Sequence, residues 1–249
     1  MFVLLIAAAV AAASPVPAAD PGCAAGVKGG VCRALQAQAA GDHAGAAAEF
    51  EDLAKAAAMG PERDRALAAA GNLWLAAGQP GKAALALDTA LAGTGLRAEQ
   101  RGEALLDRAR VAETQNDFKT AHARLTEATQ SIAEDPFLWY FATALAIREG
   151  DAKAATTAAT RALSIAPDEP LLLFEAGHAA QLAGDTVGAR TYWTRTMTKA
   201  ASGSPEAKGA RAALDLLAAP PPPESPPATA PRAKAKTGQA QPRDRKSVV

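Results

Sequence analysis

A short pattern recurs along this chain, with small, apolar and polar residues at regular places around it. In this pattern, which we call the turn phrase, a Gly or Asn, often followed by Asp, precedes an Ala five residues on. Gly or Asn tolerates the left-handed conformation that ends a helix, and an Asp after it can cap the next helix. Each copy therefore predicts a helical hairpin, and a tandem set predicts a repeat array. The five copies, spaced by 37, 38, 34 and 34 residues, are Gly41-Asp42, Gly78-Gln79, Asn116-Asp117, Gly150-Asp151 and Gly184-Asp185.

The residues on either side of each phrase predict where the helices meet. Small residues allow two helices to approach closely, and larger apolar residues supply the buried area of a shared core. We expect the small residue to lie between the two helices of a hairpin and the larger one to pack against the next unit. Seven residues before the turn stand Ala34, Gly71, Ala109, Thr143 and Gly177, and nine residues after it stand Phe50, Leu87, Leu125, Ala159 and Trp193.

The array is followed by one more helical pattern. In residues 205–219, Ala207, Ala210, Leu214 and Leu217 fall on one face, which predicts a helix that caps the exposed end of the array. The three or four additional residues of the early repeats are expected in connecting loops, around residues 59–62 and 93–99. The predicted solenoid with its cap therefore spans residues 27–219, after a linker at 19–26.

The array resembles the tetratricopeptide-repeat family, whose unit pairs two antiparallel helices with small residues at fixed places. Leu53, Arg108 and Thr196 depart from the family pattern in the first, third and fifth units. The resemblance covers about residues 27–199 and implies an all-α, right-handed superhelical solenoid of about five hairpins plus a C-terminal capping helix. The fourth unit matches through Trp139, Ala142, Gly150, Asp151, Ala155, Ala162 and Pro167, and the second through Gly71, Trp74, Gly78, Ala83 and Ala90.

The resemblance also implies a binding surface, because the family lines a concave groove with the first helix of each hairpin. Aromatic side chains beside charged ones can anchor an extended peptide or a helix. Phe141 and Phe174 have an alternative role, packing between adjacent hairpins. Relatives that grip a C-terminal carboxylate use a Lys, Arg and Asn cluster that is not predicted here. The groove residues expected from the register are Asn72, Asp107, Arg110, Glu113, Tyr140, Phe141, Arg148, Phe174, His178 and Gln181.

An apolar run of twelve residues, 2–13, opens the chain and is followed by a stretch of small residues and prolines. This length suits the core of a signal peptide and is too short to span a bilayer. We predict a signal peptide at residues 1–18 with cleavage after Ala18, and a periplasmic or secreted, envelope-associated bacterial protein. No Lys or Arg precedes the run, so an uncleaved membrane anchor is the alternative.

The two cysteines of the chain, Cys23 and Cys32, lie just beyond this segment. Their separation of nine residues suits a local disulfide in an oxidising compartment. Two unpaired thiols, or acylation of Cys23, are the alternatives.

Composition and charge narrow the choice of partner. The chain is 49% hydrophobic but only 4% aromatic, which favours closely packed, alanine-rich helices. Residues 19–219 hold 20 basic and 24 acidic residues, and this acidic balance argues against a nucleic-acid-binding fold. Residues 220–249 begin with a proline-rich stretch and hold six basic and two acidic residues. This composition predicts a disordered tail. Binding of that tail to an anionic envelope polymer or membrane surface is an alternative function.

No catalytic, cofactor or metal motif is present. The three histidines fall in three different units without clustered ligands, and no nucleophile elbow or phosphate-binding loop occurs. An enzyme site among Glu113, Arg148 and His178 is a further alternative. We therefore predict a non-catalytic adaptor that needs no cofactor and binds a protein or peptide, with no nucleic-acid partner and with membrane contact only if the N-terminal segment is uncleaved.

Overall fold

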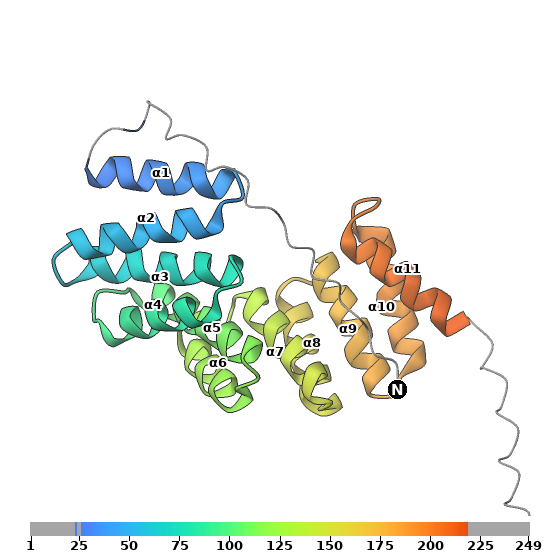
Figure 1. Cartoon of the computed structure of the whole chain (residues 1–249). Helices are drawn as coiled ribbons and strands as arrows, with labels where there is room; N and C mark the ends of the chain where they lie inside the picture. The colour runs from blue at the N-terminus through green and yellow to red at the C-terminus, as the bar shows by residue number, and fades with distance from the viewer. Residues whose placement is uncertain (1–22, 24–25, 219–249) are drawn as a thin grey trace, which may run out of the picture. The chain divides into compact units, whose positions relative to one another are not determined.

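The computed structural model describes residue 23 and residues 26–218, and Figure 1 shows this part as a series of helices. The predicted signal peptide, most of the linker and the basic tail lie outside the described residues. Within the described residues there are eleven α-helices and no strand. They are α1 (Val27–Ala39), α2 (His43–Ala56), α3 (Pro61–Ala76), α4 (Pro80–Ala92), α5 (Ala98–Thr114), α6 (Phe118–Ile132), α7 (Pro136–Glu149), α8 (Ala152–Ile165), α9 (Pro170–Leu182), α10 (Thr186–Lys199) and α11 (Pro205–Ala218).

The first ten helices pack in consecutive pairs, each pair forming one unit: α1 with α2, α3 with α4, α5 with α6, α7 with α8, and α9 with α10. The first helices of neighbouring units also contact one another, α3 with α5, α5 with α7, and α7 with α9. This arrangement confirms the predicted all-helical solenoid of five hairpins followed by a final helix.

The turn phrases act as predicted. Gly41, Gly78, Gly150 and Gly184 have φ angles between 68° and 79°, and Asn116 has φ 58°. These left-handed residues reverse the chain between paired helices. The Asp that follows caps the next helix in four units, because its carboxylate accepts a backbone N–H three residues on. In the second unit Gln79 makes no such bond.

The larger apolar residue after the turn packs against the next unit, as expected, and it also packs inside its own hairpin. A Cβ at Gly71 would lie 2.4 Å from Cγ of Leu87, and a Cβ at Gly177 would lie 2.3 Å from Nε1 of Trp193. The reason is geometric, because positions at similar distances before and after a turn oppose each other in an antiparallel pair. A glycine is therefore required opposite each of these two large side chains.

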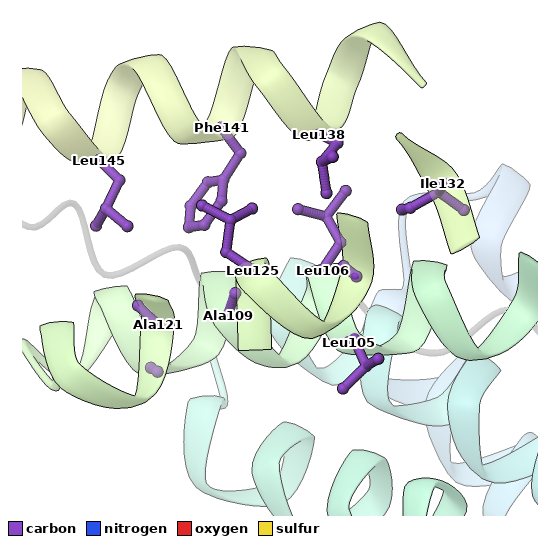
Figure 2. Packing of buried hydrophobic residues seen from close by; sticks show 11 residues of the cluster. Leu105, Leu106, Ala109, Ala121, Leu125, Ile132, Leu138, Phe141 and Leu145 are labelled. Carbon is purple, nitrogen blue, oxygen red and sulfur yellow. The ribbon is translucent and has the colours of Figure 1, made fainter. Parts of the chain in front are cut away.

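The core between α5, α6 and α7 shows how successive units are joined. In Figure 2, Leu138, Phe141 and Leu145 extend from one side of α7 towards Leu106 of α5 and Leu125 of α6. Phe141 is only 8% exposed. The prediction that Phe141 lines a binding groove is therefore wrong, and its alternative role between adjacent hairpins is the one observed.

The loop between the second and third units is held by a buried carboxylate. Asp64 in the first turn of α3 is 2% exposed, and its Oδ2 accepts the backbone N–H of Gly95 at 2.9 Å. Burying a carboxylate is costly unless such hydrogen bonds compensate. This bond fixes the loop, and with it Leu96, beside α3.

A disulfide links Cys23, a described residue before α1, to that helix. Cys23 and Cys32 form a disulfide whose Cα atoms are 5.7 Å apart, so residue 23 is tied to α1. Among the described helices, none has the length and apolarity that crossing a bilayer requires.

Candidate functional site

The contacts between α3, α5, α7 and α9 place eight of the predicted groove residues on one row of helices, and we call their surface the first-helix face. Phe141 is excluded by burial and Phe174 is treated below. The first-helix face comprises Asn72, Asp107, Arg110, Glu113, Tyr140, Arg148, His178 and Gln181.

One set of polar side chains connects α3 to α5. Asn72 Nδ2 donates to Asp107 Oδ2 at 2.8 Å, and Arg110 Nη1 donates to Asp107 Oδ1 at 2.9 Å. Burial raises the pKa of Asp107, while the hydrogen bond from Asn72 and the charge of Arg110 act in the opposite direction. Each oxygen of this carboxylate accepts one bond, although a carboxylate has about four acceptor positions in all.

A second set connects α7 to α5. The Arg148 guanidinium pairs with the Glu113 carboxylate, and its Nη2 donates to Asn116 Oδ1 at 2.9 Å. The same guanidinium lies 5.6 Å from the ring centre of Phe118. Arg148 is thus engaged by the third unit, so its replacement by Ala is expected to loosen two units rather than to act on a partner alone.

Tyr140 occupies the middle of the face with a different environment. Its half-buried phenol has a pKa raised first by burial and then by the Glu175 carboxylate, with a smaller effect of Glu206, while Arg110 lowers it. Burial also raises the pKa of Glu175. Glu175 forms no hydrogen bond or ion pair with any described residue, which leaves a half-buried carboxylate beside Tyr140 available to a ligand.

The C-terminal end of the face is mainly structural. The Phe174 and His178 rings meet edge to face at 4.6 Å, and His178 meets Trp193 at 5.3 Å. A Cβ at Gly209 of α11 would lie 2.6 Å from Phe174 Cζ. Phe174 therefore packs between the fifth unit and the final helix, which corrects its assignment to the groove. Burial lowers the pKa of His178, whereas Gln181 on the same helix is exposed.

A pocket of about 490 Å³ lies at the N-terminal end of the face, and we call it the α3–α5 pocket. It combines an apolar floor with polar groups. Of its residues, only Asn72 and Asp107 were predicted as groove residues. It is lined by Gln38, Phe50, Arg65, Ala68, Ala69, Asn72, Leu73, Leu96, Gln100, Glu103, Ala104, Leu106 and Asp107.

Two pocket residues that were not predicted, Arg65 and Glu103, could have been found from helical periodicity. Arg65 lies two turns before Asn72, and Glu103 lies one turn before Asp107. The predicted groove residues included neither of these two positions. Gln38 and Phe50 come from the first unit, and no pattern along the chain joins them to α5.

Glu103 is exposed on α5, and several other carboxylates lie near its own. Desolvation raises its pKa, as do the neighbouring carboxylates of Glu99, Asp107 and Asp135, and only Arg97 opposes them. No described residue donates a hydrogen bond to it. A bound cation would remove this repulsion.

The three residues of the alternative enzyme site, Glu113, Arg148 and His178, do not come together. Glu113 and Arg148 pair with each other, whereas His178 packs against the Phe174 and Trp193 rings. Over the residues that the structure describes, no group of His, Cys, Asp and Glu side chains could hold a metal ion.

Comparison with known proteins identifies the fold. YrrB, described as a TPR protein with an unusual peptide-binding site, is 16% identical with a TM-score of 0.55 over 76% of this chain and 91% of its own. A tetratricopeptide repeat protein from Parabacteroides merdae is 14% identical with a TM-score of 0.60, covering 76% of this chain and 72% of its own. BtubC from P. vanneervenii is 19% identical with a TM-score of 0.61, covering 83% and 87%. No protein-family model and no curated protein matches the sequence.

Proposed function

Because the chain has the tetratricopeptide-repeat fold, we propose that it is a non-catalytic scaffold that binds an extended segment of another protein on the first-helix face. One observation supports this most directly. A pocket lined by both apolar and polar side chains opens where α3 and α5 meet, while most large apolar side chains of these helices are buried. Such a combination of an apolar floor and a few polar groups is typical of binding sites.

The side chains along the face divide into structural and available groups. Asp107, Glu113 and Arg148 are partly or fully satisfied by neighbouring units. Tyr140 and the carboxylate of Glu175 beside it are not paired in this way. A half-buried tyrosine next to polar groups is the kind of residue that dominates binding energy at interfaces.

The compartment that we propose is the bacterial cell envelope. The apolar run at residues 2–13 supports export, and the disulfide between Cys23 and Cys32 is chemically suited to an oxidising compartment. The partner would then be another envelope protein.

Site-specific photo-crosslinking in intact cells tests the proposal. A photoreactive residue at position 140 should yield protein adducts, whereas one at Thr157, an exposed position on α8, should not. Comparable adducts from both positions, or adducts only from 157, would contradict binding on the first-helix face. Tyr140→Ala, tested by affinity capture of the same adduct partner, should reduce recovery without changing the helical circular dichroism signal.

A further inference from the structure

The α3–α5 pocket has an apolar floor with negative charge on one wall. Phe50, Leu73, Leu96 and Leu106 supply the floor, and Ala68, Ala69 and Ala104 also line the pocket. The alanines leave space that larger side chains would fill, and the volume is about 490 Å³. A floor of this kind favours a long, flexible, largely aliphatic side chain.

The charged wall comes from α5. Glu103 and Asp107 lie one turn apart on that helix and both line the pocket. The Glu103 carboxylate has no hydrogen-bond donor among the described residues, and Asp107 keeps acceptor positions beyond the bonds from Asn72 and Arg110. The lining therefore holds two carboxylates and one guanidinium, that of Arg65 on α3, which pairs with neither of them.

The pocket continues beyond Phe50. A second hollow of about 470 Å³ shares Phe50 and Arg65 with it and is otherwise lined by Val31, Leu53, Glu62, Ala66 and the alanines at 56–58. An extended segment that crosses Phe50 would thus meet apolar surface on both sides. The side-chain amides of Gln38, Asn72 and Gln100 line the first pocket, and amides can pair with peptide N–H and C=O groups.

We infer that the α3–α5 pocket receives a lysine or arginine side chain from an extended segment of the partner protein, a conclusion that rests on the proposed function. The aliphatic stem lies on the floor formed by Phe50, Leu73 and Leu106. The cationic end lies between the Glu103 and Asp107 carboxylates. An acidic segment is rejected, because like charges would meet at this wall.

The test is a selection of random dodecapeptides displayed on phage against the full chain with its disulfide intact. The selection is repeated on Glu103→Gln, on Glu103→Lys and on the control Glu169→Gln, which removes an equal charge from an exposed carboxylate before α9. Wild-type and control proteins should enrich Lys or Arg at one peptide position. Glu103→Lys should enrich Asp or Glu there instead.

Affinity measurements make the same comparison quantitative. A synthetic peptide from the wild-type selection should bind Glu103→Gln about 10-fold more weakly than wild type, with the control unchanged. Enriched peptides that carry no basic preference and depend on Tyr140 but not on Glu103 would overturn the inference and leave the proposed function standing. Failure to enrich any peptide would contradict both. Matching circular dichroism spectra ensure that the variants are folded.

Discussion

At the residue scale, the neighbours Trp139 and Tyr140 show that adjacent residues of one helix have different surroundings. Trp139 Nε1 donates to the carbonyl of Ala133 at 2.7 Å, and the Arg161 guanidinium of α8 lies 6.0 Å from its ring. Tyr140 instead faces Arg110 and Glu175, on the first helices of the adjacent units. Successive residues of an α-helix point about 100° apart, so adjacent positions serve different surfaces.

The first prediction compares truncations at these two positions. Trp139→Ala should lower the free energy of unfolding by about 2 to 4 kcal/mol, because it removes a partly buried indole and its hydrogen bond. Tyr140→Ala should cost about 1 kcal/mol of stability or less but weaken partner binding by about 1 to 4 kcal/mol. Urea unfolding and affinity measurements check both. The reverse pattern would mean that the face lies elsewhere on α7.

A second prediction concerns the half-buried carboxylate of Glu175, whose pKa burial raises above the ordinary value of 4.5. A raised folded-state pKa means that the folded state binds a proton more readily than the unfolded state, so stability falls as pH rises through this range. Glu175→Gln should therefore raise the melting temperature near pH 7, and the gain should vanish near pH 4. Thermal melts at both pH values decide this. A gain that is equal at both would show that burial of charge is not the cause.

At the element scale, the second helix of each hairpin is capped at its N-terminus by Asp in four units but not in the second unit. Asp42, Asp117, Asp151 and Asp185 each accept a backbone N–H at the start of α2, α6, α8 and α10. In α4 the N-cap is Gln79, whose side chain makes no capping bond although its backbone, with ψ 68°, resembles that of the capped units. The start of the second helix in the second hairpin therefore lacks the side-chain acceptor that the other four have.

This difference gives a paired prediction. Asp151→Ala should destabilise the chain by about 1 kcal/mol, the usual cost of losing a cap. Gln79→Asp should stabilise it by about 0.5 to 1 kcal/mol, because an Asp at this backbone conformation can reach a backbone N–H at the start of α4. Chemical denaturation measures both changes. If Gln79→Asp had no effect, water would already satisfy that end of α4.

At the scale of the whole molecule, each unit contacts mainly its neighbours, so the last unit depends on what covers it. Trp193 and Ala189 of α10 form a cluster with Ala210 of α11, and Leu214 and Leu217 pack against it. The Phe174 ring contacts the same helix at Gly209. In repeat arrays a terminal element with a polar outer side protects the apolar end from water.

The fourth prediction follows from this arrangement. A chain that ends at Gly203 should unfold at least about 3 kcal/mol more easily than one that ends at Ala218, because the apolar cluster around Trp193 becomes exposed. Tryptophan fluorescence during urea unfolding measures the difference. Equal stability of the two chains would show that α11 adds little to the solenoid.

The fifth prediction concerns export of the whole chain. The mature protein should begin at Ala19, and its intact mass should lie about 2 Da below that of the reduced form, since disulfide formation removes two hydrogens. N-terminal sequencing and mass spectrometry of protein isolated from the envelope fraction check this. A chain that retains Met1, or one whose Cys23 and Cys32 label as free thiols, would count against the exported form.

By itself the sequence determined the number, pairing and approximate bounds of the helices. The reason is that these features depend on local chemistry, since Gly or Asn ends a helix and Asp begins the next within two residues. Gly71 and Gly177 were likewise recognisable as close approaches, because antiparallel pairing makes positions on either side of a turn oppose each other.

Only the tertiary structure decided which side chains of the first helices remain available. The bonds from Asn72 to Asp107 and from Arg148 to Glu113 each span 35 residues, one repeat, and whether such side chains meet depends on how two units pack. The burial of Phe141 depends on the same packing. The α3–α5 pocket draws its lining from α1, α2, α3, α5 and a loop, and no local pattern records that these five segments converge.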